Sequence, residues 1–305
     1  MEAILLSVAV RTLVAGTPLL LGTLGEILAE RSGVLNLGVE GMMAIGAVSG
    51  YLAALASGSP WLGLAAALAA GLAISAIHAF VSISLKANQV VSGLSLTMLG
   101  LGMASLFGKP FIGRPLPVKM EVLRLPLLAD IPVLGPVLFS REPVFSISVL
   151  LGLVFAFLLS RTRWGIEVRS VGENPAAADA AGVSVSAQRY LCTLLGGALA
   201  GLAGAYLSLV YSNSWMEGMT GGRGWIVIAL TIFALWRPGR AFLGAYLFGV
   251  IFVLQYLLQP LGIPPNLLGM MPYLATLTVL VAGGLRADHR NLAAPAALGE
   301  PFSKS

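Results

Sequence analysis

Charged side chains are scarce in this sequence. Asp, Glu, Lys and Arg make up 10% of the 305 residues, whereas hydrophobic residues make up 57% and the mean hydropathy is +0.91. Soluble globular domains carry about 25% charged residues, so this chain has too few for a water-facing surface. We therefore expect an all-α polytopic membrane protein whose residues 1–305 form one transmembrane domain. The net charge of +5 then reports membrane topology, and we expect no nucleic-acid partner.

Residues for disulfide, nucleotide and metal chemistry are also missing. The single cysteine, Cys192, lies inside an apolar run and has no partner for a disulfide. No segment matches the phosphate-binding pattern GxxxxGK[ST], no His, Asp and Glu residues have metal-ligand spacing, and no base stands beside a nucleophile. We expect no cofactor, no metal and no catalytic site. Any energy input must come from a partner or from an ion gradient.

Long apolar segments are what the sequence has instead. A bilayer core of about 30 Å needs roughly 20 apolar residues per helix. This length predicts between eight and ten membrane-spanning helices, with nine as the best count, at residues 4–29, 34–57, 60–85, 89–108, 144–160, 189–211, 225–237, 240–260 and 267–285. Two of them, 144–160 and 225–237, are short for a full span. The first segment opens with Glu2 rather than a basic region, which indicates a retained anchor.

Arginine-rich loops suggest a topology, because cytoplasmic loops carry an excess of Lys and Arg. Three regions are assigned to the cytoplasm on this basis: Arg161, Arg163, Arg169 and Arg189, then Arg237 and Arg240, then Arg286 and Arg290. The loop 161–188 and the tail 286–305 are therefore expected inside. The loop 109–143 and the amino terminus are expected outside.

A glycine-rich stretch with an acid opens the second apolar segment. Gly33, Gly38 and Gly41 weaken regular helix there, as in discontinuous spans that border a cavity. Asn36 and Glu40 are four residues apart and would share one helical face. Two hypotheses stay open for Glu40: it borders a substrate path, or it pairs structurally with a basic residue or lies near the cytoplasmic interface.

Other polar side chains within or beside the apolar segments are weaker candidates. Ser92, Ser95 and Thr97 could face the same path, although hydroxyls in membrane helices commonly bond their own backbone. Asn213 and Trp215 lie in a glycine-rich outer loop, where they could contact an external binding protein or the headgroup region.

The segment "VGENPAAADAAGV" interrupts the apolar chain at residues 171–183. Asn174 is a favoured N-cap, Pro175 suits the first helical position, and Gly182 suits the position just past the end. A short helix over 175–181 is therefore predicted. It has little apolar area for lipid, and its small side chains would let a partner approach closely. A connecting loop without a partner is the alternative.

This alanine-rich segment resembles the cytoplasmic coupling loop of membrane subunits of ATP-binding-cassette (ABC) importers for branched-chain amino acids, simple sugars and nucleosides. The stretch "ERSGVLNLGVEGMMAIGA" at 30–47 is most similar to the nucleoside branch, and "ALTIFALWRPGRAFLGAYLFG" follows downstream. The resemblance implies a non-catalytic permease in the bacterial cytoplasmic membrane. Residues that would couple to the ATPase are Glu173, Asn174, Pro175, Ala176, Ala177, Asp179, Ala180, Ala181 and Gly182.

The resemblance also implies partners: a second related permease, a cytoplasmic ATPase formed by a two-domain chain, an external substrate-binding lipoprotein and a small-molecule substrate. Nucleosides are the expected substrate, with simple sugars or branched-chain amino acids as the alternative. A different class, an ion-coupled transporter acting alone, would need intramembrane relays. Glu40 and His78 are the main candidates for that role.

Overall fold

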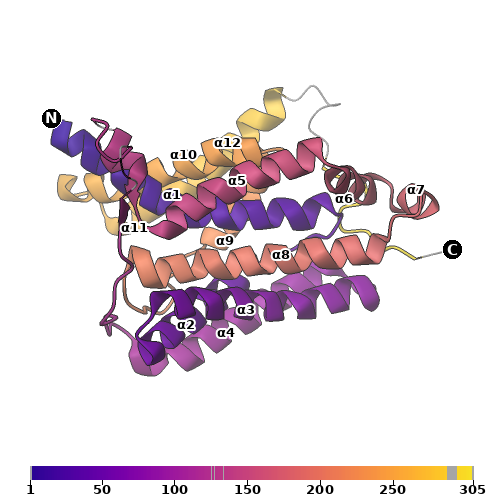
Figure 1. Cartoon of the computed structure of the whole chain (residues 1–305), viewed down its shortest axis with the longest axis horizontal. Coiled ribbons are helices and arrows are strands. Elements are labelled where there is room, and N and C mark those ends of the chain that lie inside the picture. Colours follow the sequence, from indigo (N-terminus) through magenta and orange to yellow (C-terminus); the bar gives the residue numbers. More distant parts are fainter. Residues whose placement is uncertain (1, 125, 127, 133, 287–293, 304–305) are drawn as a thin grey trace.

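The computed structural model describes residues 2–124, 126, 128–132, 134–286 and 294–303. Within these residues the fold is a bundle of helices lying side by side, as Figure 1 shows. The described part contains one small sheet, in which β1 (Leu123–Arg124) pairs antiparallel with β2 (Ser140–Arg141). The chain is therefore an all-α polytopic membrane protein, as its composition predicts.

Seven described helices are long and apolar enough to cross a membrane. They are α1 (Glu2–Arg31), α2 (Val39–Ser57), α3 (Pro60–Ala79) with the π-helical turn η1 (Phe80–Ser84), α4 (Gln89–Gly108) with the 3-10 turn η2 (Lys109–Phe111), α5 (Pro143–Arg161), α8 (Val185–Tyr206) with the π-helical turn η4 (Leu207–Tyr211), and α10 (Pro238–Leu258) with the 3-10 turn η5 (Gln259–Leu261). Each matches a segment found by its hydropathy.

The remaining two apolar segments also form helices, but shorter ones. These are α9 (Arg223–Phe233) and α12 (Met271–Arg286), which α11 (Pro265–Gly269) precedes. The segment 144–160, which is short in the sequence, extends by one residue at each end to form α5, with Pro143 in its first turn. All nine predicted segments are thus helical, and two of them fall short of the length of a simple span.

Helix α8 occupies the centre of the bundle, where it packs against α1, α2 and α3. Glycines allow these contacts. A Cβ on Gly46 would lie 2.1 Å from the carbonyl oxygen of Gly201, and a Cβ on Gly71 would lie 2.2 Å from that of Gly197. Because lipid supplies no hydrophobic drive between helices, close backbone packing of this kind holds the bundle together.

The two ends of the bundle differ. Helices α6 (Arg163–Glu173) and α7 (Pro175–Ala180) lie at one end with the carboxyl-terminal residues, and the amino terminus lies at the other (Figure 1). The turn at Trp236 joins the first end, since its carbonyl accepts a hydrogen bond from Arg31. The arginine-rich loops 161–188 and 235–240 therefore share one end. Arg290 lies outside the described residues.

Candidate functional site

A non-helical segment connects α1 to α2 at residues 32–38, inside the bundle. Gly33 has φ +88° and the backbone stays irregular until Val39. Val34 is fully buried and Asn36 is 1% exposed. The glycine-rich pattern predicts this interruption. The expected shared helical face of Asn36 and Glu40 is wrong, because Asn36 precedes the start of α2.

Side chains from α3 and α4 satisfy the backbone of this segment. Gln89 accepts from the Leu35 N–H at 2.7 Å, and the Thr97 hydroxyl donates to the Leu37 carbonyl at 2.8 Å. His78 Nε2 lies 3.1 Å from the Leu35 carbonyl. Unpaired backbone groups are very costly at membrane depth, so these three side chains permit the irregular segment.

The histidine tautomer follows from these contacts. A carbonyl oxygen can only accept, so His78 Nε2 carries the proton that it donates to Leu35. A neutral imidazole then has Nδ1 as its acceptor, and the Ser92 hydroxyl lies 2.9 Å from that atom. His78 and Ser92 therefore hold the irregular segment in place. Ser95, by contrast, is exposed on the surface of α4.

Asn36 is tied to α1. Its Nδ2 donates to Glu26 Oε2 at 3.1 Å, and its Oδ1 accepts from the Gly38 N–H at 3.0 Å. Glu26 is 1% exposed and Glu30, one turn further along α1, is 2% exposed. Glu30 in turn accepts a hydrogen bond from the Trp236 indole.

Sequence reasoning missed Glu26 and Glu30 as members of this site. The signal was present, because two acids four residues apart near the end of an apolar helix share one face. They were overlooked because the predicted span 4–29 ends between them, which makes Glu30 look like a surface residue of the following loop.

Glu40 caps the start of α9. Its Oε1 accepts from the Gly222 N–H at 2.9 Å and its Oε2 accepts from the Gly224 N–H at 2.6 Å. Helix N-termini leave such N–H groups unsatisfied and favour negative charge. A Cβ on Gly224 would lie 2.5 Å from the Glu40 backbone, so glycine is required there.

The hypothesis that Glu40 pairs with a basic residue is therefore wrong, since backbone N–H groups provide the pairing. Arg223, the nearest cation in the sequence of α9, has its guanidinium carbon 4.7 Å from the centre of the Phe252 ring and 5.4 Å from that of Tyr211. Its charge is satisfied by aromatic faces and by the Met219 and Thr220 carbonyls.

The opposite end holds Asn213 and Trp215. Trp215 is only 2% exposed and packs against Gly108, so it has little surface for an external partner. Asn213 is half-buried, and its Nδ2 donates to the Leu116 carbonyl. The neighbouring Glu217 is exposed and accepts from the Ser105 hydroxyl, which makes it the more accessible group of this loop.

Helix α7 forms as its caps predict. The Asn174 side chain accepts from the Ala177 N–H at 3.0 Å, and Gly182 has φ +84°. The helix ends at Ala180, one residue earlier than expected. Ala177 and Ala180 are exposed, whereas Ala178 is buried. The preceding helix α6 was not expected from the sequence.

The carboxyl-terminal tail lies against α7 and the irregular segment. The Ala297 N–H donates to the Gly172 carbonyl at 2.8 Å, and the Gly299 N–H donates to the Gly33 carbonyl at 3.2 Å. Phe302 packs on the cluster that contains Ala178. The tail thus links α7 to the start of the irregular segment at residues 32–38.

Arg189, at the start of α8, fixes this link. It is 1% exposed, and its guanidinium donates to the Ser32 carbonyl at 3.2 Å and to the Glu300 carbonyl at 2.9 Å. One buried cation therefore holds α8, the irregular segment and the tail together. Within the described residues no three His, Cys, Asp or Glu side chains gather as metal ligands would.

Residues 8–281 match the family described as branched-chain amino acid transport system, permease component. The chain belongs to this family. It is accordingly a multi-pass permease subunit of an ABC transporter, a transport component that works with an ATPase and a substrate-binding protein.

Relatives extend along nearly the whole chain. TsgC13 of Haloferax volcanii, whose name provisionally describes a glucose ABC transporter permease, is 40% identical. The alignment covers 96% of this chain and 96% of TsgC13. The guanosine ABC transporter permease NupQ of Bacillus subtilis is 37% identical over 96% of this chain and 95% of its own. The nucleoside ABC transporter permease NupC of Lactococcus lactis is 32% identical over 88% and 89%.

Two further comparisons concern another permease relative and the fold. Bacillus subtilis has a second relative, the guanosine ABC transporter permease NupP, 29% identical over 71% of this chain and 64% of NupP. A solved ABC transporter in an inward-facing conformation, provisionally of the metal-chelate type, has a TM-score of 0.53 at 18% identity and covers 90% of this chain and 86% of its own. It supports the permease fold.

The Glu40 cap yields a prediction. Glu40→Ala should lower the free energy of unfolding by about 2–3 kcal/mol, because it leaves the partly buried Gly222 N–H and the buried Gly224 N–H without their charged acceptor. Glu40→Gln keeps one acceptor oxygen and should lose less. Thermal unfolding of the purified chain in detergent measures this, and the unfolding midpoint should rise from Glu40→Ala to Glu40→Gln to the wild type.

The matched control for this series is Glu121→Ala, which removes an exposed carboxylate from the loop 109–143. It should leave the unfolding midpoint unchanged. A capping role is excluded if Glu40→Ala is as stable as the control and uptake by the assembled transporter is nevertheless lost.

Proposed function

We propose that this chain is one of two unlike, non-catalytic permease subunits of an ATP-driven importer of nucleosides. The observation that carries the proposal is α7, a capped helix that exposes Ala177 and Ala180 beyond the end of the bundle. A short helix of small side chains has little to gain from lipid, and it offers a flat surface to a protein partner. We infer that the partner is the ATPase.

The proposed orientation places α7 in the cytoplasm. The arginine-rich loops 161–188 and 235–240 share one end of the bundle, and the tail residues 294–303 join them. Basic loops favour the cytoplasmic side. On the opposite side, the loop 109–143 pairs with the loop at 212–215 through short β-bridges, and this surface would receive the substrate-binding protein.

The tail gives α7 a route to the membrane interior. Phe302 contacts the α7 side, Gly299 is bonded to Gly33, and Arg189 joins the tail to Ser32. The irregular segment then leads into α2, whose Glu40 holds α9. A displacement of α7 by the ATPase would in this way reach α2, α9 and the irregular segment between α1 and α2.

Within this proposal the path residues divide into two groups. Asn36, Glu40 and Thr97 are buried in the chain and bonded to its own backbone or to Glu26, so we assign them to the support of the path wall. Ser92 belongs with them through His78. Ser95 is exposed on α4, the least buried of the seven long helices, and we assign it to the path surface.

Nucleosides are proposed as substrate because NupQ and NupC carry guanosine and nucleoside in their names and match most of this chain. A simple sugar is the second candidate, since TsgC13 is described for glucose at 40% identity. Uptake of labelled guanosine and labelled glucose by the reconstituted importer separates the two.

The docking proposal predicts a specific loss of coupling. Replacing Ala177 and Ala180 with Trp should abolish substrate-stimulated ATP hydrolysis by the assembled transporter, because the indoles block close approach at α7. Helix α7 lies outside the bundle core, so insertion should be normal. ATPase activity is measured with and without substrate and binding protein in proteoliposomes.

Ala56→Trp provides the control, since Ala56 is exposed near the end of α2 on the opposite side of the bundle. It should retain stimulation. If the α7 variant also stimulates normally in a complete complex, α7 is not the coupling element.

The path proposal predicts a difference in thiol reactivity. Cys192 is the single cysteine and is fully buried, so the background reaction is low. Ser95→Cys should react rapidly with a charged thiosulfonate in membranes, because charged reagents reach only water-facing thiols. Asn36→Cys, at a position 1% exposed, should react at least about tenfold more slowly in the resting transporter.

Leu150→Cys tests exposure alone, because Leu150 is 60% exposed on the apolar surface of α5. It should remain unreactive in the bilayer. Equal reactivity at Ser95 and Leu150 would remove Ser95 from the path.

Pairing with a second permease is proposed because NupQ and NupP are both named for guanosine and differ in their similarity to this chain. Repulsion between two Glu40 carboxylates in a homodimer cannot support the pairing, because each Glu40 is capped by backbone N–H groups of its own chain. Co-expression with the related permease and the ATPase should give complexes with one copy of each permease by intact mass. An active complex with two copies of this chain and no other permease would contradict the proposal.

A further inference from the structure

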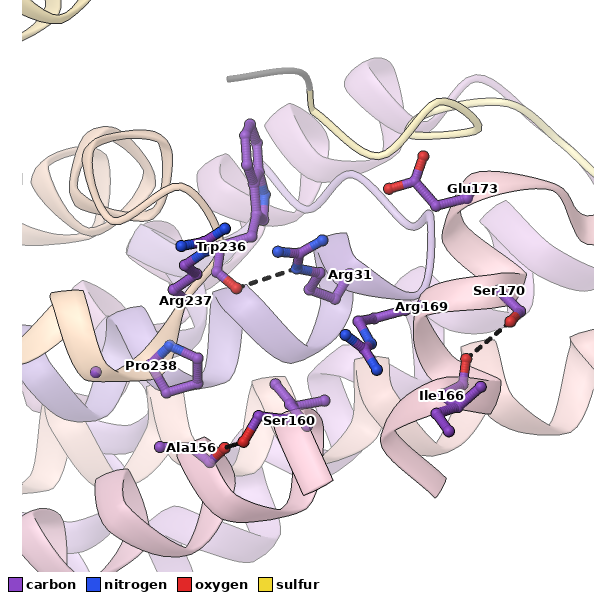
Figure 2. Close-up of a pocket in the computed structure, with 12 residues that line it drawn as sticks. Arg31, Ala156, Ser160, Ile166, Arg169, Ser170, Glu173, Trp236, Arg237 and Pro238 are labelled. Atoms are coloured by element: carbon purple, nitrogen blue, oxygen red, sulfur yellow. Dashed lines mark hydrogen bonds between the residues drawn. The ribbon is translucent and has the colours of Figure 1, made fainter. Parts of the chain in front are cut away.

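A pocket of about 830 Å³ opens at the proposed cytoplasmic end of the bundle. The end of α1, the end of α5, helix α6 and the turn into α10 all contribute to its walls, as Figure 2 shows. Its charged lining residues are Arg31, Arg169, Arg237 and Glu173. The three arginines have no place in the substrate path or in the exposed face of α7, whereas Glu173 is also one of the residues expected to couple to the ATPase.

Positive charge dominates this pocket. Three guanidinium groups accompany one carboxylate, which gives the described lining a net charge of +2, and Arg31 interacts electrostatically with Arg169, Arg237 and Glu173. Within the described part of the chain, none of the three arginines has a carboxylate oxygen within 4.0 Å. Glu173 is also shared with the tail, because it accepts from the Ala296 N–H.

Two of the arginines are held in position by the backbone. Arg31 Nε donates to the Trp236 carbonyl at 3.0 Å, and Arg169 Nε donates to the Gly165 carbonyl at 3.1 Å. Figure 2 shows both side chains between the turn at Trp236 and α6. Arg237 is exposed at the rim. Guanidinium groups fixed in this way match the oxygens of a phosphate group.

We propose that this pocket binds the phosphate of an anionic phospholipid. The apolar surroundings favour a lipid over a free phosphate. Leu153 and Phe157 on α5 are 59% and 61% exposed, and Leu243 on α10 is 72% exposed. They lie within about one turn of the lining residues Ala156 and Gly239. A phospholipid can place its phosphate among the arginines and its acyl chains along these side chains.

The position at the membrane boundary supports the same ligand. Basic pockets between transmembrane helices on the cytoplasmic side are suited to anionic head groups. Because α6 provides Arg169 and Glu173 just before α7, an occupied pocket would also brace the base of α7. Lipid binding itself does not depend on the proposed substrate or on the ATPase.

Native mass spectrometry of the delipidated full chain tests this site with dioleoyl phosphatidylglycerol, dioleoyl phosphatidylcholine and inorganic phosphate as probes. Arg169→Gln with Arg237→Gln should weaken phosphatidylglycerol binding roughly 10-fold to 30-fold, as expected for two cations near a phosphate. The matched control is Arg163→Gln with Arg240→Gln, which removes two exposed charges outside the pocket, one from α6 and one from the first turn of α10. It should change binding less than about twofold.

Three results would overturn the proposal. The first is equal phosphatidylglycerol affinity in the pocket and control variants. The second is equal affinity of the wild type for phosphatidylcholine, which would show that the pocket does not select a lipid by its negative charge. The third is inorganic phosphate displacing the lipid at micromolar concentration, which would identify a free anion as the ligand. If the double variant does not fold, the single variant Arg237→Gln, at an exposed position, replaces it in the binding comparison.

Discussion

The need to satisfy backbone hydrogen bonds away from water governs this structure. A helix satisfies its own N–H and C=O groups, but residues 32–38 do not form one and still lie buried in the bundle. Gln89, Thr97 and His78 supply the missing partners. These side chains come from α3 and α4, so the irregular segment holds these two helices in a fixed relation.

The same principle explains the second irregular place, the start of α9. Its first N–H groups point at the Glu40 carboxylate, so a charge that is expensive inside a membrane helix is used where a helix N-terminus needs it. Glu40, Gly222 and Gly224 therefore form one structural unit, in which the carboxylate accepts from the two backbone N–H groups. Similarly, Arg189 is tolerable in a buried position because two backbone carbonyls accept hydrogen bonds from its guanidinium group.

Local features of this fold could be predicted from the sequence, and distant contacts could not. The apolar segments and the caps of α7 depend on neighbouring residues, so hydropathy and the Asn174 and Gly182 positions were sufficient. Glu40 and Gly222 are 182 residues apart, and one sequence offers no sign that they meet. The same holds for the tail, whose few apolar residues give no hint that Phe302 packs beneath α7.

The distance along the chain between Glu40 and its cap also has a consequence for biosynthesis. Ribosomes add about 5–20 residues per second, so α9 emerges roughly 10–40 s after α2 has reached the membrane. During that time the carboxylate has no N–H groups to bind, and an acid at the centre of a span opposes insertion by about 2.5 kcal/mol or more. Glu40 lies in the first turn of α2, where it can stay near the interface until α9 arrives. The contact between the second helix and α9 can thus form only when much of the protein has been made.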